Sequence, residues 1–189
     1  YLDVDGDGIP YRTIPATHPD KGAYFTRGTT RNAYAKYSEV GADYMYNMER
    51  LRRKQDTAKT LVPAPILTPA SQATRYGVIY YGSTSAAMAE ALALMEADGV
   101  HVDALRVRAF PFASEVDAFI EAHDLVFVVE QNESAQLRQM LINEGDLSPK
   151  KLVRVLHYDG TPITARFIAG TIADAVDDRK VQPISKVTA

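Results

Sequence analysis

The sequence predicts an α/β protein with a mainly parallel sheet, preceded by an irregular segment and a long helix. Two observations predict this fold. After residue 75, short β-branched and aromatic runs alternate with helical patterns of about ten to fifteen residues, which is typical of right-handed crossovers and of a sheet covered on both faces. Before that point, residues 1–37 are rich in proline, glycine, threonine and tyrosine and lack a sustained helical or strand period, so we expect extended, irregular chain.

The next stretch, residues 38–61, predicts one long helix. A set of mostly apolar residues falls at three- and four-residue spacings and marks one face of an amphipathic helix. These residues are Val40, Tyr44, Met45, Met48, Leu51, Gln55, Ala58 and Leu61. The run RLRRK at 50–54 lies on the charged side, where it is either a solvated face or a contact for an acidic partner or phosphate. Three prolines in residues 62–75 end the helix, and we expect an extended linker there.

Four strand-and-helix pairs are expected in an α/β domain at residues 76–179. The expected strands are 76–82, 100–110, 125–132 and 151–160, and the expected helices are 83–99, 111–124, 133–145 and 161–178. Ser83 or Ser85 is the expected N-cap of the first of these helices and Ser114 that of the second, while Gly99 ends the first. Residues 180–189 are expected to be a loose tail.

The composition argues against several functional classes. Apolar residues make up 46% and charged residues 24% of the 189 residues, which is ordinary for a globular protein. A formal charge of −3 provides no basic field for nucleic acid, and the absence of cysteine leaves no disulfide, thiolate nucleophile or iron–sulfur ligand. No signal peptide and no apolar run of roughly 20 residues occur, so we expect a cytoplasmic protein without a membrane partner. Because the sequence begins at Tyr1 rather than at methionine, we expect a processed piece or a fragment of a longer protein.

The first expected strand of the sheet is followed by small polar residues at the edge where open α/β sheets bind ligands. Gly82, Ser83, Thr84 and Ser85 open a helix, and its free backbone N–H groups and the hydroxyls could hold a phosphate or a carboxylate. The stretch lacks the G-x-G-x-x-G fingerprint and the P-loop lysine. Serines at this position also act as simple helix caps, so both interpretations stay open.

Two further strand ends carry groups suited to acid–base chemistry. Glu130 and Asn132 follow the third expected strand, and His157 ends the fourth. They serve as acid and base only if they converge, and polar residues at strand ends also satisfy loops or subunit contacts. The other histidines have no metal-ligand spacing, and no G-x-S-x-G motif occurs, so neither zinc nor a serine hydrolase is indicated.

The opening DVDGDG resembles the start of a calcium loop. Asp3, Asp5 and Asp7 occupy the first, third and fifth ligand positions, and Gly8 stands where the loop turns sharply. Ile14 occupies the place of the bidentate glutamate that should close the cage. The stretch is therefore either a nonstandard cation site or an Asp/Gly turn.

Several stretches, in order along nearly the whole chain, carry a resemblance to a known family. They are YLDVDGDGIPYRT, THPDKGAYFTRGT, NMERLRRKQDTAKTLVPAP, YGSTS, LRVRAFPF, VFVVEQN, QLRQML and YDGTPITARFI. This succession closely resembles the C-terminal portion of the alpha subunit of 2-oxoacid:ferredoxin oxidoreductases, above all the 2-oxoglutarate type. The resemblance implies that residues 76–179 form a three-layer sandwich of the transketolase C-terminal type, and that the leading residues link back to a missing domain.

The resemblance also implies an activity for the whole enzyme. Such enzymes use thiamine diphosphate and Mg²⁺ to decarboxylate a 2-oxo acid, transfer the acyl group to coenzyme A and pass electrons through an iron–sulfur cluster to ferredoxin. The cofactor lies between the pyrimidine-binding domain of the alpha subunit and the beta subunit, which also holds the cluster. We therefore expect this chain to be a structural and assembly domain that binds none of these cofactors itself, has the beta subunit as its partner and is inactive alone.

One loop departs from the pattern of that family. The segment matching GTTRNAY often reads Gly-x-His-Asp-Glu near the substrate entrance, whereas this chain has Thr30, Arg31, Asn32 and Ala33. The change removes an acidic pair, so the resemblance places only Arg27, Arg31 and Asn32 near substrate or coenzyme A. A disordered linker loop is the alternative.

Two rival functions remain. The chain could be a stand-alone flavodoxin-like module that uses the residues after the first strand of its sheet to bind a phosphorylated small molecule, or a pure interaction domain. The aromatic residues Tyr11, Tyr24, Phe25 and Tyr34 of the leading segment favour a partner surface, because a solitary binding protein has no need of them.

Overall fold

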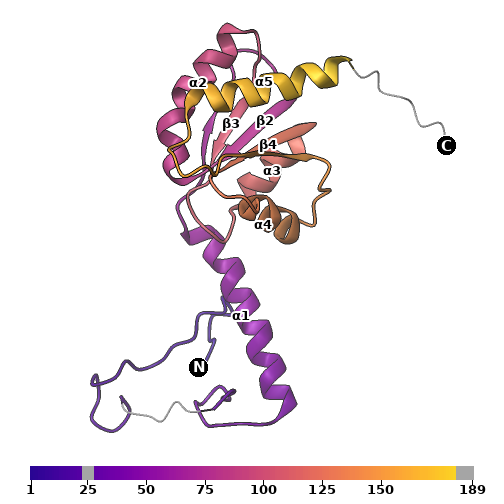
Figure 1. Ribbon diagram of the computed structural model, residues 1–189. Helices are drawn as coiled ribbons and strands as arrows, with labels where there is room; N and C mark the ends of the chain where they lie inside the picture. The colour runs from indigo at the N-terminus through magenta and orange to yellow at the C-terminus, as the bar shows by residue number, and fades with distance from the viewer. Residues whose placement is uncertain (23–27, 182–189) are drawn as a thin grey trace, which may run out of the picture. The chain divides into compact units, whose positions relative to one another are not determined.

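The computed structural model describes residues 1–22 and 28–181 of the chain (Figure 1). These residues fall into two compact units, of which the first spans Tyr1–Val62 and the second begins at Pro63. Each unit has its own internal contacts.

The first unit consists of helix α1, Gly41–Leu61, and the irregular chain that precedes it. As expected, the described part of residues 1–37 forms turns and two isolated bridges, and its backbone lies against one side of the helix. Polar side chains of α1 make this contact. They are Arg50, whose Nη1 donates to Gly8 O at 2.9 Å; Arg53, paired with Asp3 at 3.1 Å; Thr57, whose Oγ1 donates to Asp7 O at 2.6 Å; and Asn47, whose Nδ2 donates to Arg31 O at 2.7 Å.

The polar side of α1 is therefore the packed side, contrary to the amphipathic pattern. Arg50 is buried, so the interpretation of RLRRK as a solvated face is wrong at that position. The side chains expected to form the buried apolar face are mostly exposed instead, among them Val40 at 60%, Met45 at 63% and Leu61 at 71%. The backbone carbonyls of an irregular segment need donors, and the polar side of the helix supplies them.

The second unit is built on a five-stranded sheet in the order β1-β3-β2-β4-β5. The strands are β1 Ile66–Thr68, β2 Tyr76–Tyr80, β3 Asp103–Arg106, β4 Leu125–Glu130 and β5 Leu152–Leu156. All neighbouring pairs are parallel except β1 and β3, so the mainly parallel sheet is confirmed. Strand β1 lies within the stretch expected to be only a linker, where Ile66 pairs with Arg106.

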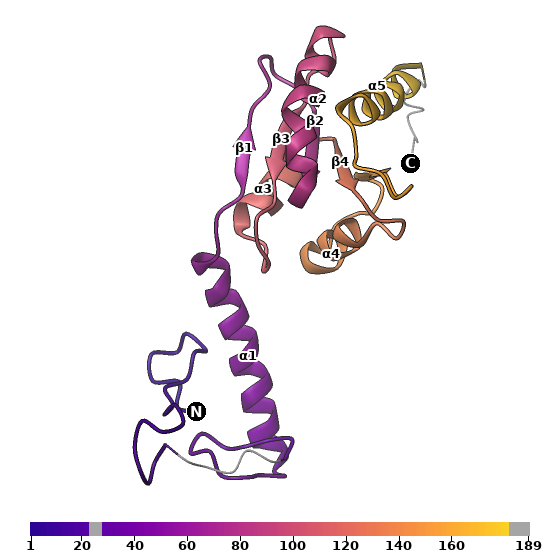
Figure 2. The same ribbon diagram turned by 60° about the vertical axis from the view of Figure 1, so that its left-hand side comes forward.

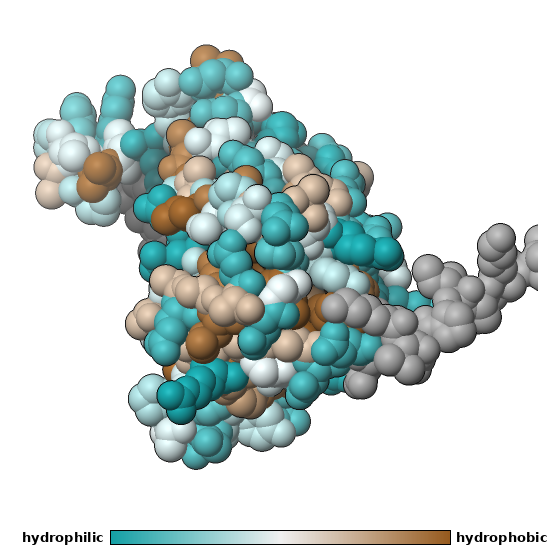
Figure 3. Space-filling view, turned by 90° about the horizontal axis from the view of Figure 1, so that it is seen from above, coloured by the Kyte–Doolittle hydropathy of each residue, from teal (hydrophilic) through white to brown (hydrophobic). Residues whose placement is uncertain are grey.

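Helices cover both faces of this sheet, which gives the three-layer sandwich (Figures 1 and 2). Helices α2, Ser85–Ala97, and α5, Ala165–Val181, pack on one face over a core that includes Val78 and Phe127. Helices α3, Ser114–Ala122, and α4, Gln136–Gly145, pack on the other face. On the surface seen in Figure 3, hydrophobic side chains occur in separate patches between hydrophilic ones. None of the described helices is long and apolar enough to cross a membrane.

The expected serine caps are absent, although the helix end at Gly99 is confirmed. A 3-10 turn, η1 Gly82–Thr84, leads into α2, and the Ser85 hydroxyl donates to Gly82 O at 2.6 Å rather than capping the helix. Ala113, not Ser114, is the N-cap residue of α3, and it has no side-chain hydrogen bond. Gly99 has φ of +73°, a conformation that glycine adopts without strain at a helix end.

Candidate functional site

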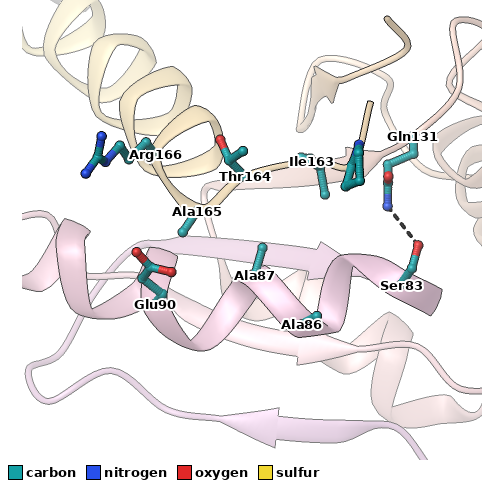
Figure 4. A pocket seen from close by; sticks show the side chains of 10 residues that line it. Ser83, Ala86, Ala87, Glu90, Gln131, Ile163, Thr164, Ala165 and Arg166 are labelled. Atoms are coloured by element: carbon teal, nitrogen blue, oxygen red, sulfur yellow. Dashed lines mark hydrogen bonds between the residues drawn. The ribbon is translucent and has the colours of Figure 1, made fainter. Parts of the chain in front are cut away.

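A cavity of about 830 Å³ opens at the carboxyl edge of the sheet, between α2 and the beginning of α5 (Figure 4). It lies where the chain order reverses, because β2 has β3 on one side and β4 on the other. Open α/β sheets bind ligands at such a switch point. The polar side chains in its wall are Ser83, Glu90, Gln131, Thr164 and Arg166.

Gln131 bridges the two sides of the switch point. Its Nε2 donates to Ser83 Oγ at 3.0 Å (Figure 4) and also to Thr84 Oγ1 at 3.2 Å. These two hydrogen bonds link the end of β4 to the turn after β2. Of the predicted anion-binding residues, Ser83 lines the cavity, Thr84 is 2% exposed, and the hydroxyl of Ser85 is bonded to Gly82. Anion binding by these four residues stays a prediction, and it rests on the Ser83 hydroxyl and nearby backbone N–H groups.

The charged groups of the cavity lie away from that bridge. Glu90 and Arg166 lie at one end of the cavity wall, and Ser83 and Gln131 lie at the other end, with apolar side chains of α2 between them (Figure 4). Glu90 is the one carboxylate among the described residues of the wall, so the cavity provides too few oxygen ligands for the ion of a magnesium diphosphate.

Glu130 and His157 do not form an acid–base pair. The Glu130 carboxylate is fully buried and points to the beginning of α4, where its oxygens accept from Leu137 N at 2.7 Å and from Arg138 N at 3.0 Å. The Asn132 amide donates to the same carboxylate at 2.8 Å. Glu130 thus supplies an anion to a helix N-terminus, which is a structural role.

The His157 side chain lies on the opposite face of the sheet. Its ring stacks edge-on against Phe167 of α5, with centroids 4.9 Å apart. Nε2 lies 3.5 Å from Asp159 Oδ1. Hydrogen bonds from the backbone N–H and the hydroxyl of Thr161 hold the pKa of Asp159 below its usual range. These contacts order the loop after β5, as the structural interpretation of this strand end expected.

A buried histidine–aspartate pair was not anticipated from the sequence. His123 is 5% exposed, with Nδ1 2.7 Å from Phe119 O and Nε2 3.0 Å from Asp103 Oδ2. Asp103 Oδ1 also accepts from Ala70 N at 2.8 Å. Both ring nitrogens face acceptors, and the tautomer decides which of them donates. The pair ties the chain after β1 to β3 and to the end of α3.

The structure brings Asp3, Asp5 and Asp7 together, with one oxygen of each within 4.8 Å of the others. Asp3 also accepts from Gly8 N at 3.0 Å and pairs with Arg53. Burial raises the pKa of Asp3, but the hydrogen bonds from Arg53 and Gly8 outweigh it and leave that pKa below its usual range. Such contacts are equally those of an Asp/Gly turn. Cation binding stays a prediction: millimolar calcium should raise the melting temperature if the three carboxylates hold the ion.

Of the residues expected near substrate or coenzyme A, Arg27 lies outside the described residues. Asn32 closes a turn: its backbone N donates to Lys36 O at 2.9 Å, and its Oδ1 accepts from Tyr34 N at 3.0 Å. Arg31 Nη1 donates to Ala35 O at 3.0 Å. The described part of this loop is thus ordered by its own hydrogen bonds.

Comparisons with known proteins establish the fold. No protein-family profile matches the sequence, and no curated protein matches it by sequence. A 2-oxoglutarate:ferredoxin oxidoreductase from Magnetococcus marinus, solved with 2-oxoglutarate, coenzyme A and succinyl-CoA bound, matches 86% of this chain with a TM-score of 0.74 and 19% identity. This chain spans only 28% of that one. The fold that the resemblance implied is thereby confirmed.

Two other solved structures are similar over a smaller part of the chain. A split-gene transketolase in its inactive beta4 tetramer has a TM-score of 0.43 and 19% identity, over 59% of this chain and 41% of its own. The alpha chain of a probable 2-oxoacid ferredoxin oxidoreductase from Thermoplasma acidophilum has a TM-score of 0.41 and 22% identity, over 60% of this chain and 97% of its own.

Proposed function

We propose that this chain is the C-terminal structural and assembly part of the alpha subunit of a thiamine-diphosphate-dependent 2-oxoacid:ferredoxin oxidoreductase, acting on 2-oxoglutarate with coenzyme A. The observation that carries the proposal is the extent of the fold match. The match covers 86% of the chain, which is more than residues 63–189 alone make up. It therefore includes part of the leading unit, residues 1–62. A likeness confined to a common α/β sandwich would not reach the irregular segment and its helix. The ordered run of sequence motifs supports the same family.

In this proposal the chemistry belongs to other parts of the complex. The chain has no cysteine to bind an iron–sulfur cluster, and the cavity at the sheet edge offers a single carboxylate to a metal ion. Thiamine diphosphate, when bound in the complex, supplies the electron sink for decarboxylation. In this proposal the chain provides a contact surface for assembly. Large apolar side chains are exposed along α1, and they are suited to burial against the rest of the alpha subunit or against the beta subunit.

The test is purification of the native protein that contains this chain. The proposal predicts a companion beta subunit and reduction of ferredoxin that requires coenzyme A and is faster with 2-oxoglutarate than with pyruvate. Met45→Glu, at an exposed position of α1, should weaken recovery of the companion, whereas Arg52→Glu on the same helix serves as a matched control. Isolation as a monomer without thiamine diphosphate or iron would contradict the proposal.

A second candidate function rests on the cavity at the switch point of the sheet. A stand-alone flavodoxin-like module would use Ser83, Gln131 and Arg166 to bind a phosphorylated small molecule. Native mass spectrometry of the purified chain would then show a retained nucleotide or sugar phosphate, and Arg166→Gln would release it. If the chain carries no such ligand and Arg166→Gln changes nothing, this alternative fails.

A further inference from the structure

The leading unit contains a second cavity, of about 250 Å³, whose wall includes the side chain of Arg50. We infer that this cavity binds an oxyanion, the phosphate or carboxylate group of a small molecule, through the Arg50 guanidinium. The inference stands on contacts within residues 1–62 and does not depend on the proposed function.

Arg50 is a buried charged residue of this unit. It is only 7% exposed, and its Nη1 donates to the backbone carbonyl of Gly8 at 2.9 Å. Nε is fully buried and has no hydrogen-bond acceptor among the described residues. A buried N–H without an acceptor costs about 1–3 kcal/mol, and more when it belongs to a charged group. A neutral carbonyl at Nη1 does not offset the charge.

Among the described residues that line the cavity, no side chain supplies a compensating anion to Arg50. Asp3, the acidic side chain that contacts α1 in this unit, is already paired with Arg53. None of the described residues lining the cavity is an aspartate or a glutamate, while Arg31 adds a second guanidinium to its wall. An unneutralised guanidinium at such depth is destabilising, so a negatively charged ligand would stabilise the folded unit.

The remaining wall suits oxygen atoms of a ligand. Thr29 and Thr30 contribute hydroxyl groups, and Asn47 lines the same space while its amide donates to Arg31 O at 2.7 Å. The two terminal nitrogens of a guanidinium each have an N–H that points the same way, and this pair matches the two oxygens of a carboxylate or phosphate. Because Nε is fully buried, a ligand in the cavity would reach Arg50 at this terminal edge, beside the hydrogen bond from Nη1 to Gly8 O.

The test follows the arginine Nε–H signals of the ¹⁵N-labelled full chain by NMR during titration with sodium phosphate and, separately, sodium acetate, with chloride holding the ionic strength constant. We expect a saturable shift of the Arg50 signal and none of the exposed Arg52 on the same helix. Saturation by phosphate alone identifies a phosphate-bearing ligand, and saturation by acetate identifies a carboxylate. Both results support the inference.

Two variants make the inference falsifiable. Arg50→Lys should weaken anion binding about tenfold or more, because it removes the bidentate contact. If that variant does not fold, Met48→Glu serves instead: Met48 lines the cavity and is 44% exposed, so a tethered carboxylate there should compete with the added anion. Met45→Glu, one turn away and 63% exposed, is the matched control and should leave the titration unchanged. Equal, non-saturating shifts of Arg50 and Arg52, or an affinity unaffected by Arg50→Lys and Met48→Glu, would overturn the inference.

Discussion

Replacing Glu130 with alanine should be among the most damaging single changes in the sheet unit, although the residue lies at a strand end that resembles a catalytic position. Its carboxylate accepts from the backbone N–H groups of Leu137 and Arg138 and from the side chain of Asn132. Alanine removes all three acceptors at once. The Leu137 N–H is buried and has no route to water, so its hydrogen bond cannot be replaced by solvent.

The expected loss follows from these contacts. An orphaned buried N–H costs about 1–3 kcal/mol, and loss of a helix N-terminal acceptor costs typically about 1 kcal/mol. Together they predict that Glu130→Ala lowers the free energy of unfolding by about 3 kcal/mol. For a unit of this size, 1 kcal/mol corresponds to about 4 °C, so the melting temperature should fall by roughly 10 °C. Glu130→Gln keeps one neutral acceptor and should cost about half as much.

Urea unfolding followed by circular dichroism measures both losses. Glu133→Gln, at an exposed position of the same loop, is the control and should stay within about 0.5 kcal/mol of the parent chain. If Glu130→Ala and Glu133→Gln unfold at the same urea concentration, the carboxylate does not stabilise α4. A folded but inactive Glu130→Gln complex of undiminished stability would instead return Glu130 to the role of a catalytic acid.

Three other predictions concern single positions. Gly8 has φ +83°, and a Cβ added there would lie 2.2 Å from a backbone nitrogen of α1, so Gly8→Ala should disrupt the leading unit. Gly6 has a similar φ of +76° but lies in open space, so Gly6→Ala should lower the stability far less. Thermal unfolding compares the two variants. The pKa of Asp3 is lower in the folded chain than in the unfolded chain. The stability that Asp3 contributes is therefore present above its unfolded pKa near 4 and disappears as the pH falls through the lower folded pKa. A carboxyl ¹³C titration measures the folded pKa, and a value at or above about 4 would refute the argument. His123→Gln should lower the free energy of unfolding by about 1–3 kcal/mol because it breaks the contact with Asp103, and urea unfolding of the variant and the parent chain measures this loss.

The alternation of strands and helices in the sheet unit can be predicted from the sequence, because most of these elements have a local residue pattern of their own. Strand β4 is a continuous apolar run and is buried along nearly its whole length, which local composition alone indicates. Strand β1 has no such signal: all three of its residues are exposed, and prolines flank it. It forms because β3 has a free edge, and this pairing joins residues about forty positions apart.

The candidate sites show the same division between local and long-range information. Topology places Ser83 at the carboxyl edge of the sheet, as predicted, but its hydrogen-bond partner Gln131 is 48 positions away and no local pattern selects it. Arg50 stands in a run of similar basic residues. Only the position of the Gly8 carbonyl distinguishes it from its neighbours, and that position depends on how residues 1–22 fold back onto α1.

The short antiparallel strand β1 is the edge of the sheet, and its length and flanking prolines limit aggregation at that edge. The outer side of a three-residue strand with exposed side chains is an open template for another polypeptide, and such edges lead to edge-to-edge aggregation. Pro65 precedes β1 and Pro69 follows it. Since proline has no N–H to donate, an incoming strand finds room for three residues and no more. Pro65 and Pro69, which the sequence analysis placed in a linker after the helix, thus limit the pairing of β1 with the edge strand of another molecule.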